Sequence, residues 1–282
     1  MAKTIAITAD SPVDLGTQYA SRFGISIIPL YIHLDGYTYR DGVDITPDDI
    51  FHKYETEKFL PTTSAIPVGD YTDFFRSFSD KGQTVVHLSL SSEISATHQN
   101  ARIAAEEFEN VYVLNTLNLS VGIAILALAA CDMRDRGLDA LTIVRELEAM
   151  RGKVHSSFVI DKLEFLRKGG RCSALTALGA NILNIHPSIE VIEGSLHLAK
   201  KYRGAIRAVQ LQYIDDVLEN PETAEKERAI LCHSGIPDAQ LDALLERIQQ
   251  KGIFREVLVS RAGCTISTHC GPNCIGLMFL QK

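Results

Sequence analysis

Short apolar strands alternate with helical stretches along the first half of this chain, and that order limits the folds open to it. Residues 84–90 form an apolar run that passes into a helical stretch ending near residue 108. Residues 111–114 form another short strand, and an apolar helix over residues 120–136 follows it. Strands that alternate with helices in this way predict parallel strands joined by helical crossovers. We therefore expect an α/β fold with a parallel sheet in the first half.

The second half carries hairpins as well as helices. Glu193-Gly194-Ser195 separates two strand-like runs, as Asp35-Gly36 does earlier in the chain, and both are favoured hairpin turns. A helix over residues 161–168 stops at Gly169-Gly170, and a further helix is expected over 173–183. Hairpins mixed with helices predict a mixed sheet. We expect an N-terminal α/β domain over residues 1–155 and a C-terminal α/β domain over residues 156–282.

Composition and charge exclude several classes of protein. The 282 residues are 46% hydrophobic and 22% charged, which is typical of a folded globular chain. The formal net charge of −7 disfavours nucleic acid as a partner. The longest apolar stretch, residues 121–131, is about half the length of a membrane span. The six cysteines are scattered, and the sequence begins with no secretory signal, so we expect reduced thiols and a cytoplasmic location.

Two clusters of hydroxyl side chains stand out as candidate anion sites. The run Ser91-Ser92-Glu93-Ile94-Ser95 follows an apolar strand and is expected to open a helix, where free N–H groups attract anions. Thr62-Thr63-Ser64 lies between Pro61 and Pro67, which restrict the loop. The alternative for the serines is a helix cap, and for the second cluster a surface turn.

A histidine and two arginines are further candidates. His269 lies just before the last apolar strand and can donate to a carboxylate. Arg171 and Arg203 each stand beside a glycine, where they can bind an acidic or phosphorylated partner. Each of the three also has an ordinary interpretation, as an isolated histidine or a solvated loop arginine.

Several common fingerprints are missing from the sequence. It contains no Walker loop, no G-x-G-x-x-G and no G-x-S-x-G elbow. Cys264, Cys270 and Cys274 lie near His269, but their spacing differs from the paired C-x2-C of a zinc site. We therefore expect no nucleotide cofactor and no metal.

Five motifs in this order resemble the DegV family over nearly the whole chain. They are Asp10-Ser11 with Asp14-Leu15, Thr63-Ser64 with Pro67, the run from Ser91 to Gln99, the run from Leu163 to Arg171, and His269-Cys270-Gly271-Pro272. The resemblance implies a two-domain α/β protein with a fatty acid held between its domains. In the FakB members the carboxylate meets a threonine, a serine and the C-terminal histidine.

Carried onto this sequence, the resemblance implies a ligand site made of Thr63, Ser64, Ser91 or Ser92, and His269. Ser92 is slightly preferred over its neighbour. Arg171 and Arg203 would contact a kinase that resembles dihydroxyacetone kinase and makes the acyl phosphate. A long-chain fatty acid would be the bound ligand, no cofactor is expected, and membrane contact during lipid exchange is compatible with this role. The chain departs from the family at two motif positions, Ala96 for glycine and His98 for tyrosine, which can alter the pocket.

Two other functions compete with a fatty-acid carrier. One is an esterase that uses Ser92 with His269, although no acidic residue is apparent to orient the histidine. The other is a regulatory or scaffold protein, which predicts that the purified protein carries no lipid. A carrier of this kind is not itself a catalyst.

Overall fold

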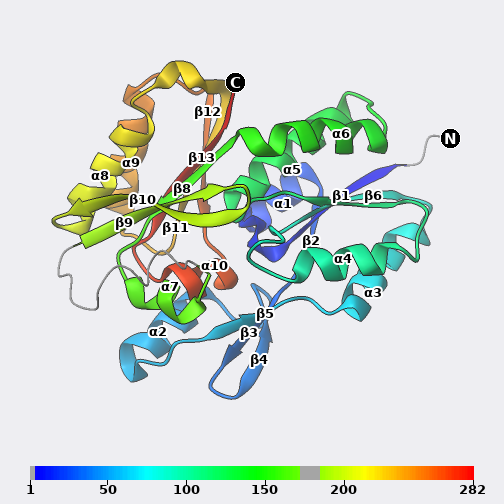
Figure 1. Ribbon diagram of the computed structural model, residues 1–282, viewed down its shortest axis with the longest axis horizontal. Coiled ribbons are helices and arrows are strands. Elements are labelled where there is room, and N and C mark those ends of the chain that lie inside the picture. Colours follow the sequence, from blue (N-terminus) through cyan, green and yellow to red (C-terminus); the bar gives the residue numbers. More distant parts are fainter. Residues whose placement is uncertain (1–3, 172–184) are drawn as a thin grey trace.

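The computed structural model describes residues 4–171 and 185–282, in which three β-sheets are surrounded by helices (Figure 1). The first sheet is parallel and has the strand order β2-β1-β6-β7. Its strands are β1 (Ile5–Asp10), β2 (Ile25–Ile28), β6 (Thr84–Ser89) and β7 (Val111–Asn115). The central strands are apolar runs because helices cover both faces of the sheet.

Helices pack on the two faces of this parallel sheet. One face carries α3 (Val68–Ser79) and α4 (Thr97–Ala105), and the other carries α5 (Val121–Asp135) and α6 (Ala140–Met150). The short helix α1 (Gly16–Phe23) lies beside the edge strand β2.

The second sheet has six strands in the order β10-β9-β8-β13-β11-β12. Only β11 and β12 pair in parallel within it, so this sheet is mixed. Its strands are β8 (Val154–Val159), β9 (Ile185–Ile192), β10 (Ser195–Arg203), β11 (Ala224–His233), β12 (Glu256–Arg261) and β13 (Ile275–Gln281). Helices α8 (Ile206–Val217) and α9 (Asp238–Gln250) cover one side.

Helix α5 contacts both of these sheets, since it packs on β1 and β6 as well as on β8, β11 and β13. A helix that is enclosed on all sides must be apolar around its whole circumference. Its sequence meets this requirement, because every residue from Val121 to Leu128 is buried.

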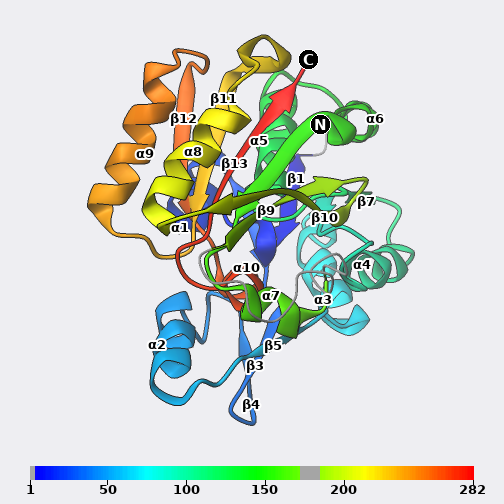
Figure 2. The same cartoon turned by 60° about the vertical axis from the view of Figure 1, so that its left-hand side comes forward.

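A third, smaller sheet lies below the other two (Figure 2). It contains β3 (Tyr31–Leu34), β4 (Tyr37–Arg40) and β5 (Thr62–Ser64) in the antiparallel order β4-β3-β5. Helices α2 (Pro47–Glu57), α7 (Leu163–Gly169) and α10 (Cys264–Cys270) gather around it. The described residues also contain the short 3-10 turns η1 (Ser11–Val13), η2 (Arg151–Lys153) and η4 (Pro221–Thr223).

The predicted fold class is confirmed, with a parallel sheet in the first half and a mixed sheet in the second. Both hairpins form where the Asp35-Gly36 and Glu193-Gly194 turns predict them. The six-stranded sheet begins at Val154, and the domain division near residue 155 stays a prediction. The helix expected over 173–183 lies outside the described residues. No helix among the described residues is long and apolar enough to cross a membrane.

One local prediction was wrong, and one helix was missed. The serine run does not open a helix, because residues 91–96 form turns and α4 begins only at Thr97. Helix α10 was not predicted at all, since its seven residues give too short a pattern to recognise. Its position matters, because it carries His269 toward the third sheet.

Candidate functional site

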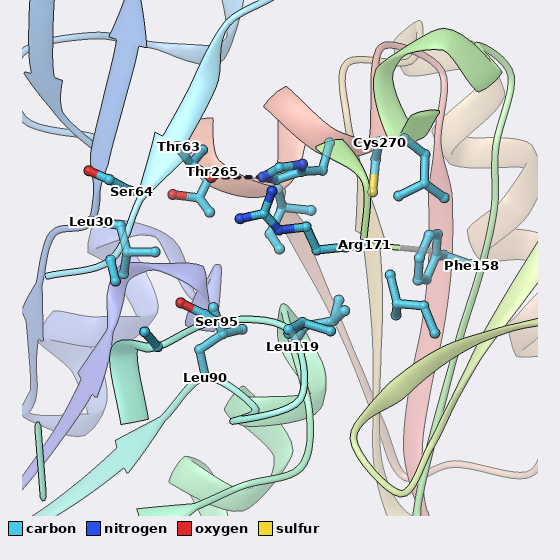
Figure 3. A pocket seen from close by; sticks show the side chains of 17 residues that line it. Leu30, Thr63, Ser64, Leu90, Ser95, Leu119, Phe158, Arg171, Thr265 and Cys270 are labelled. Carbon is cyan, nitrogen blue, oxygen red and sulfur yellow. Dashed lines mark hydrogen bonds between the residues drawn. The ribbon is translucent and has the colours of Figure 1, made fainter. Parts of the chain in front are cut away.

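A cavity of about 220 Å³ lies where the loops of all three sheets meet (Figure 3). Its polar lining consists of Thr63, Ser64, Ser95, Arg171, Thr265 and His269. Its apolar lining is larger and consists of Leu30, Ala65, Leu90, Ile94, Ala96, Leu119, Phe158, Leu166, Leu196, Ile266 and Cys270. A mostly apolar cavity with a few convergent polar groups is the usual form of a small-molecule site.

The contact at the centre of the polar lining joins Thr63 to His269, whose Oγ1 and Nε2 atoms lie 2.8 Å apart. Thr63 pairs with Ile32 across the third sheet, which directs its side chain toward the core side. His269 comes from α10, 206 residues later in the chain. The other imidazole nitrogen, Nδ1, is buried and has no hydrogen-bond partner among the described residues.

Burial keeps this imidazole neutral. Burial, with a smaller contribution from the positive charge of Arg171, lowers the pKa of His269 to about 4. A neutral imidazole can donate one hydrogen bond and accept another. His269 therefore meets an anionic group at neutral pH as a hydrogen-bond partner rather than as a cation.

The serines that the sequence favoured as ligand residues do not line the cavity. Ser91 is buried, and its hydroxyl donates to the carbonyl of Gly194 at 2.8 Å, which joins the loop after β6 to the β9–β10 turn. Ser92 is exposed, accepts from Asn115 at 2.8 Å and donates to Glu93 at 3.1 Å. The residue of this run that reaches the cavity is Ser95.

Ser95 and Thr265 line the cavity but were not among the predicted ligand residues. Ser95 Oγ lies 2.7 Å from Thr97 Oγ1 and accepts from the Thr97 amide at 3.2 Å, so it also caps the start of α4. It belongs to the same hydroxyl run as Ser92, and only the unexpected turn before α4 decides which serine faces the cavity. Thr265 is the second residue of α10 and had no signal in the sequence.

Ser64 lines the cavity wall, but its hydroxyl points away from the interior toward His33 (Figure 3). Its Oγ atom lies 2.8 Å from His33 Nε2. Neighbouring residues of a strand face opposite sides, so Thr63 and Ser64 cannot both direct their hydroxyls inward.

The two predicted arginines have different places. Arg171 lines the cavity, and its guanidinium lies among the polar side chains there (Figure 3). The polar part of the lining therefore includes a positively charged side chain as well as hydroxyls and an imidazole. Arg203 ends β10, is exposed, and is not among the residues that line the cavity.

The apolar side of the cavity leads to a second, smaller compartment of about 20 Å³. Four residues line both spaces, Leu119, Phe158, Ile266 and Cys270. Cys232 and Cys274 line the smaller one, and the five described cysteines are buried free thiols. Within the described ranges, 4–171 and 185–282, no group of three or more His, Cys, Asp or Glu side chains could hold a metal ion.

The departures from the family pattern differ in effect. Ala96 is among the residues that line the cavity. His98 does not line the cavity and instead places its Nδ1 atom 2.7 Å from Ser89 Oγ.

The arrangement does not support a serine hydrolase. Such an enzyme needs its serine within hydrogen-bond reach of the histidine. Ser92 is held by Asn115 and Glu93, whereas the hydrogen-bond partner of His269 is Thr63. The predicted Ser92–His269 pair is therefore not formed.

Comparisons with known proteins agree over the length of the chain. Residues 4–282 match the family described as "Uncharacterised protein, DegV family". A DegV domain-containing protein of Clostridium acetobutylicum is 30% identical over 282 residues, which is 99% of both chains. The structure is also similar to that of a fatty-acid-binding DegV family protein from Thermus thermophilus, with 30% identity and a TM-score of 0.90, covering 99% of this chain and 100% of the other.

Two further solved structures share the fold. One is a stearic-acid-binding protein from Eubacterium ventriosum, with 25% identity, a TM-score of 0.85 and coverage of 99% and 98%. The other is the fatty acid kinase B3 protein of Streptococcus pneumoniae loaded with linoleic acid, with 20% identity, a TM-score of 0.84 and coverage of 99% and 100%. Since the family match spans almost every residue and the fold agrees throughout, the chain belongs to the DegV family.

Proposed function

We propose that this protein binds a long-chain fatty acid in the cavity and presents its carboxylate to a partner fatty acid kinase. The observation that carries the proposal is the cavity itself, whose lining is mostly apolar and whose polar side chains include the hydrogen-bonded pair Thr63 and His269. Relatives of similar fold are described as fatty-acid-binding proteins, including one at 30% identity.

The free energy of such binding comes from the acyl chain. Each methylene removed from water contributes roughly 0.8 kcal/mol, so a long chain outweighs the cost of association. In this proposal the acyl chain of the ligand follows the apolar lining past Phe158 toward the second compartment. The ligand then lies between the proposed N-terminal domain of residues 1–155 and the C-terminal domain of residues 156–282.

The carboxylate needs hydrogen-bond donors, because a buried charge without partners is very costly. Thr63, Ser95 and His269 supply uncharged donors in the proposed complex, and Arg171 supplies a positive charge beside them. The unpaired Nδ1 atom of His269 supports this assignment, since a buried polar atom without a partner in the described chain is one that a ligand can satisfy.

The proposal includes a kinase partner because phosphorylation of the carboxylate needs ATP. The sequence of this chain contains no nucleotide-binding fingerprint, so the ATP for an acyl phosphate would come from a second protein. The exposed side chain of Arg203 is the proposed contact for that kinase, and Arg171 at the cavity could serve both partners. The protein would act in the cytoplasm, with transient membrane contact when lipid is exchanged.

The test is to identify the bound lipid and then to measure rebinding. Native mass spectrometry of the purified protein should show one acyl chain per protein molecule. Thr63→Ala should weaken rebinding of oleate by about tenfold or more, as expected for a lost hydrogen bond to a charged group. Ser92→Ala is the matched control, since Ser92 lies outside the cavity lining, and it should bind as the unaltered protein does.

Two outcomes would contradict the proposal. One is a purified protein that neither carries nor binds any fatty acid. The other is an equal loss of affinity in both variants, which would place the carboxylate away from Thr63.

A further inference from the structure

Two buried carboxyl groups from the first half of the chain meet the start of α10. Asp41 Oδ1 accepts from the Cys264 amide at 2.8 Å, and Asp14 Oδ1 accepts from the Gly263 amide at 2.8 Å. Asp14 is 4% exposed and Asp41 5% exposed. These contacts span 223 and 249 residues of sequence, so they join distant parts of the chain.

Asp41 accepts more hydrogen bonds than Asp14 does. Besides the Cys264 amide it accepts from the Thr265 amide at 3.2 Å, from the Thr265 hydroxyl at 2.7 Å and from the Ser11 hydroxyl at 2.8 Å. All four groups donate to Asp41 here, and the two backbone amides can do nothing else. An ionised carboxylate can accept all four hydrogen bonds because it has no hydrogen of its own. An asparagine side chain can accept only on one of its two terminal atoms.

Asp14 has a different chemistry. Its second oxygen lies 2.6 Å from the hydroxyl of Ser120, which is a group that can donate or accept. Burial raises the pKa of Asp14 well above its usual value, and the negative charge of Asp41 adds to that rise. A protonated Asp14 carboxyl can accept from Gly263 on one oxygen and donate to Ser120 from the other, and an asparagine amide can make the same two hydrogen bonds.

Helix α10 depends on these contacts for its position. It has seven residues, and its N-cap residue Gly263 offers no side chain to satisfy the first amides. A helix of that length is not stable by itself. It nevertheless carries Thr265, Ile266, His269 and Cys270 into the cavity, so whatever fixes the helix fixes that side of the site.

We propose that Asp41 is a positioning residue for the fatty-acid head group, which holds α10 so that His269 reaches Thr63. Asp14 supports the same helix end but can be replaced by its neutral isostere. This inference rests on the proposed fatty-acid binding, and it assigns a role in that binding to a residue that does not line the cavity.

The test compares Asp41→Asn with Asp14→Asn in the full-length protein. Affinity is measured with the fluorescent fatty acid cis-parinaric acid after removal of bound lipid. Asp41→Asn should lose about tenfold or more in affinity. In either orientation the NH2 group of the asparagine faces one of the two backbone amides, that of Cys264 or that of Thr265, which then has no acceptor. The affinity of Asp14→Asn for the same fatty acid should stay within about threefold of that of the unaltered protein.

A second measurement separates positioning from general damage. The pKa of His269, followed by NMR of its ring protons, should rise toward its usual value in Asp41→Asn as the ring leaves its buried place, while Asp14→Asn leaves it unchanged. Circular dichroism confirms that each variant is folded.

If Asp41→Asn does not fold, the same measurements are made on Ser11→Ala, which removes one of the four hydrogen-bond donors to Asp41. It should show a smaller loss of affinity together with a rise in the pKa of His269. If the affinity and the pKa of His269 are both unchanged in the folded Asp41→Asn protein, the role of Asp41 is overturned. Where Asp41→Asn does not fold, the same result in Ser11→Ala overturns it. Failure of the unaltered protein to bind the probe would instead overturn the proposed function.

Discussion

The imidazole of His269 fits into its place only because a neighbouring residue has no side chain. A methyl group added at Gly169 would lie 2.2 Å from His269 Nδ1, which is closer than any stable contact. Gly169 ends α7 and belongs to the glycine pair that the sequence predicted only as a helix stop. Its second role is to leave room for the histidine.

Gly169→Ala should therefore weaken fatty-acid binding by displacing His269 from Thr63. We expect a loss of about tenfold in affinity, as for removal of one hydrogen-bond partner of a charged ligand. Titration with a fluorescent fatty acid measures it. Gly69→Ala is the control, because nothing lies within 4 Å of the added methyl group, and its affinity should not change. Normal binding by Gly169→Ala would show that the ring can move without loss.

The neutral state of His269 predicts how stability depends on pH. Its pKa is about 4 in the folded protein and near its usual value in the unfolded chain, so the unfolded chain binds more protons between these values. The contribution to stability is complete above about pH 6.5 and is lost as the pH falls toward 4. We expect His269→Gln to reduce this pH dependence by about 1–3 kcal/mol.

Urea unfolding at a series of pH values measures this difference. His155 is an internal comparison, because burial lowers its pKa to about 4 as well and the His269 variant leaves it intact. Identical slopes for the unaltered protein and His269→Gln would show that the histidine is already exposed when the protein is folded.

At the scale of single elements, local contacts fix the start of one helix and long-range contacts fix the start of another. Helix α2 is fixed locally, since Thr46 accepts from the Asp49 amide at 3.3 Å and the Asp49 carboxylate accepts from the Thr46 amide at 2.9 Å. This reciprocal capping box joins residues only three positions apart, and Pro47 follows its first residue. Helix α10, by contrast, is held by carboxyl groups more than 200 residues away.

Thr46→Ala should lower the free energy of unfolding by about 1 kcal/mol, because it removes the cap of α2. Chemical denaturation followed by circular dichroism measures the change. Thr56→Ala is the matched control, since its hydroxyl donates to carbonyls of its own helix, those of His52 and Lys53, and the substitution should be nearly neutral. A Thr46→Ala protein as stable as the control would mean that tertiary packing alone fixes the start of α2.

At the scale of the whole molecule, buried polar groups join the carboxyl ends of the parallel strands. Asp10 at the end of β1 accepts from His87 Nε2 at 3.0 Å and from the Leu90 amide at 2.7 Å, and the hydroxyl of Tyr71 also donates to it. Leu90 lines the cavity, so this network supports one wall of the site. Helix α5 packs on both the parallel sheet and the six-stranded sheet, and so connects the two larger sheets.

A ligand enclosed by elements from all three sheets should stabilise the whole fold. At a fatty-acid concentration 100 times the dissociation constant, the expected gain is about 2.7 kcal/mol. For a chain of this size the thermal midpoint should rise by roughly 5 °C. Differential scanning fluorimetry of lipid-free protein with and without oleate measures it, and Thr63→Ala should show a smaller rise. No rise at saturation would exclude binding that spans the sheets.

The sequence alone determined the elements whose causes are local. The parallel sheet of the first half, the mixed sheet of the second, both hairpin turns and the capped start of α2 follow from apolar runs, turn residues and caps within a few positions. The family motifs added Thr63 and His269, which the structure brings within 2.8 Å of each other.

Only the tertiary structure decided which hydroxyls face the cavity. Ser95 rather than Ser92 lines it because residues 91–96 turn before α4 begins, and Thr265 lines it because Asp41 and Asp14 hold α10 there. The physical reason is that a side chain's direction depends on contacts with residues that are distant in sequence. Spacing along the chain carries no information about those contacts until the chain has folded.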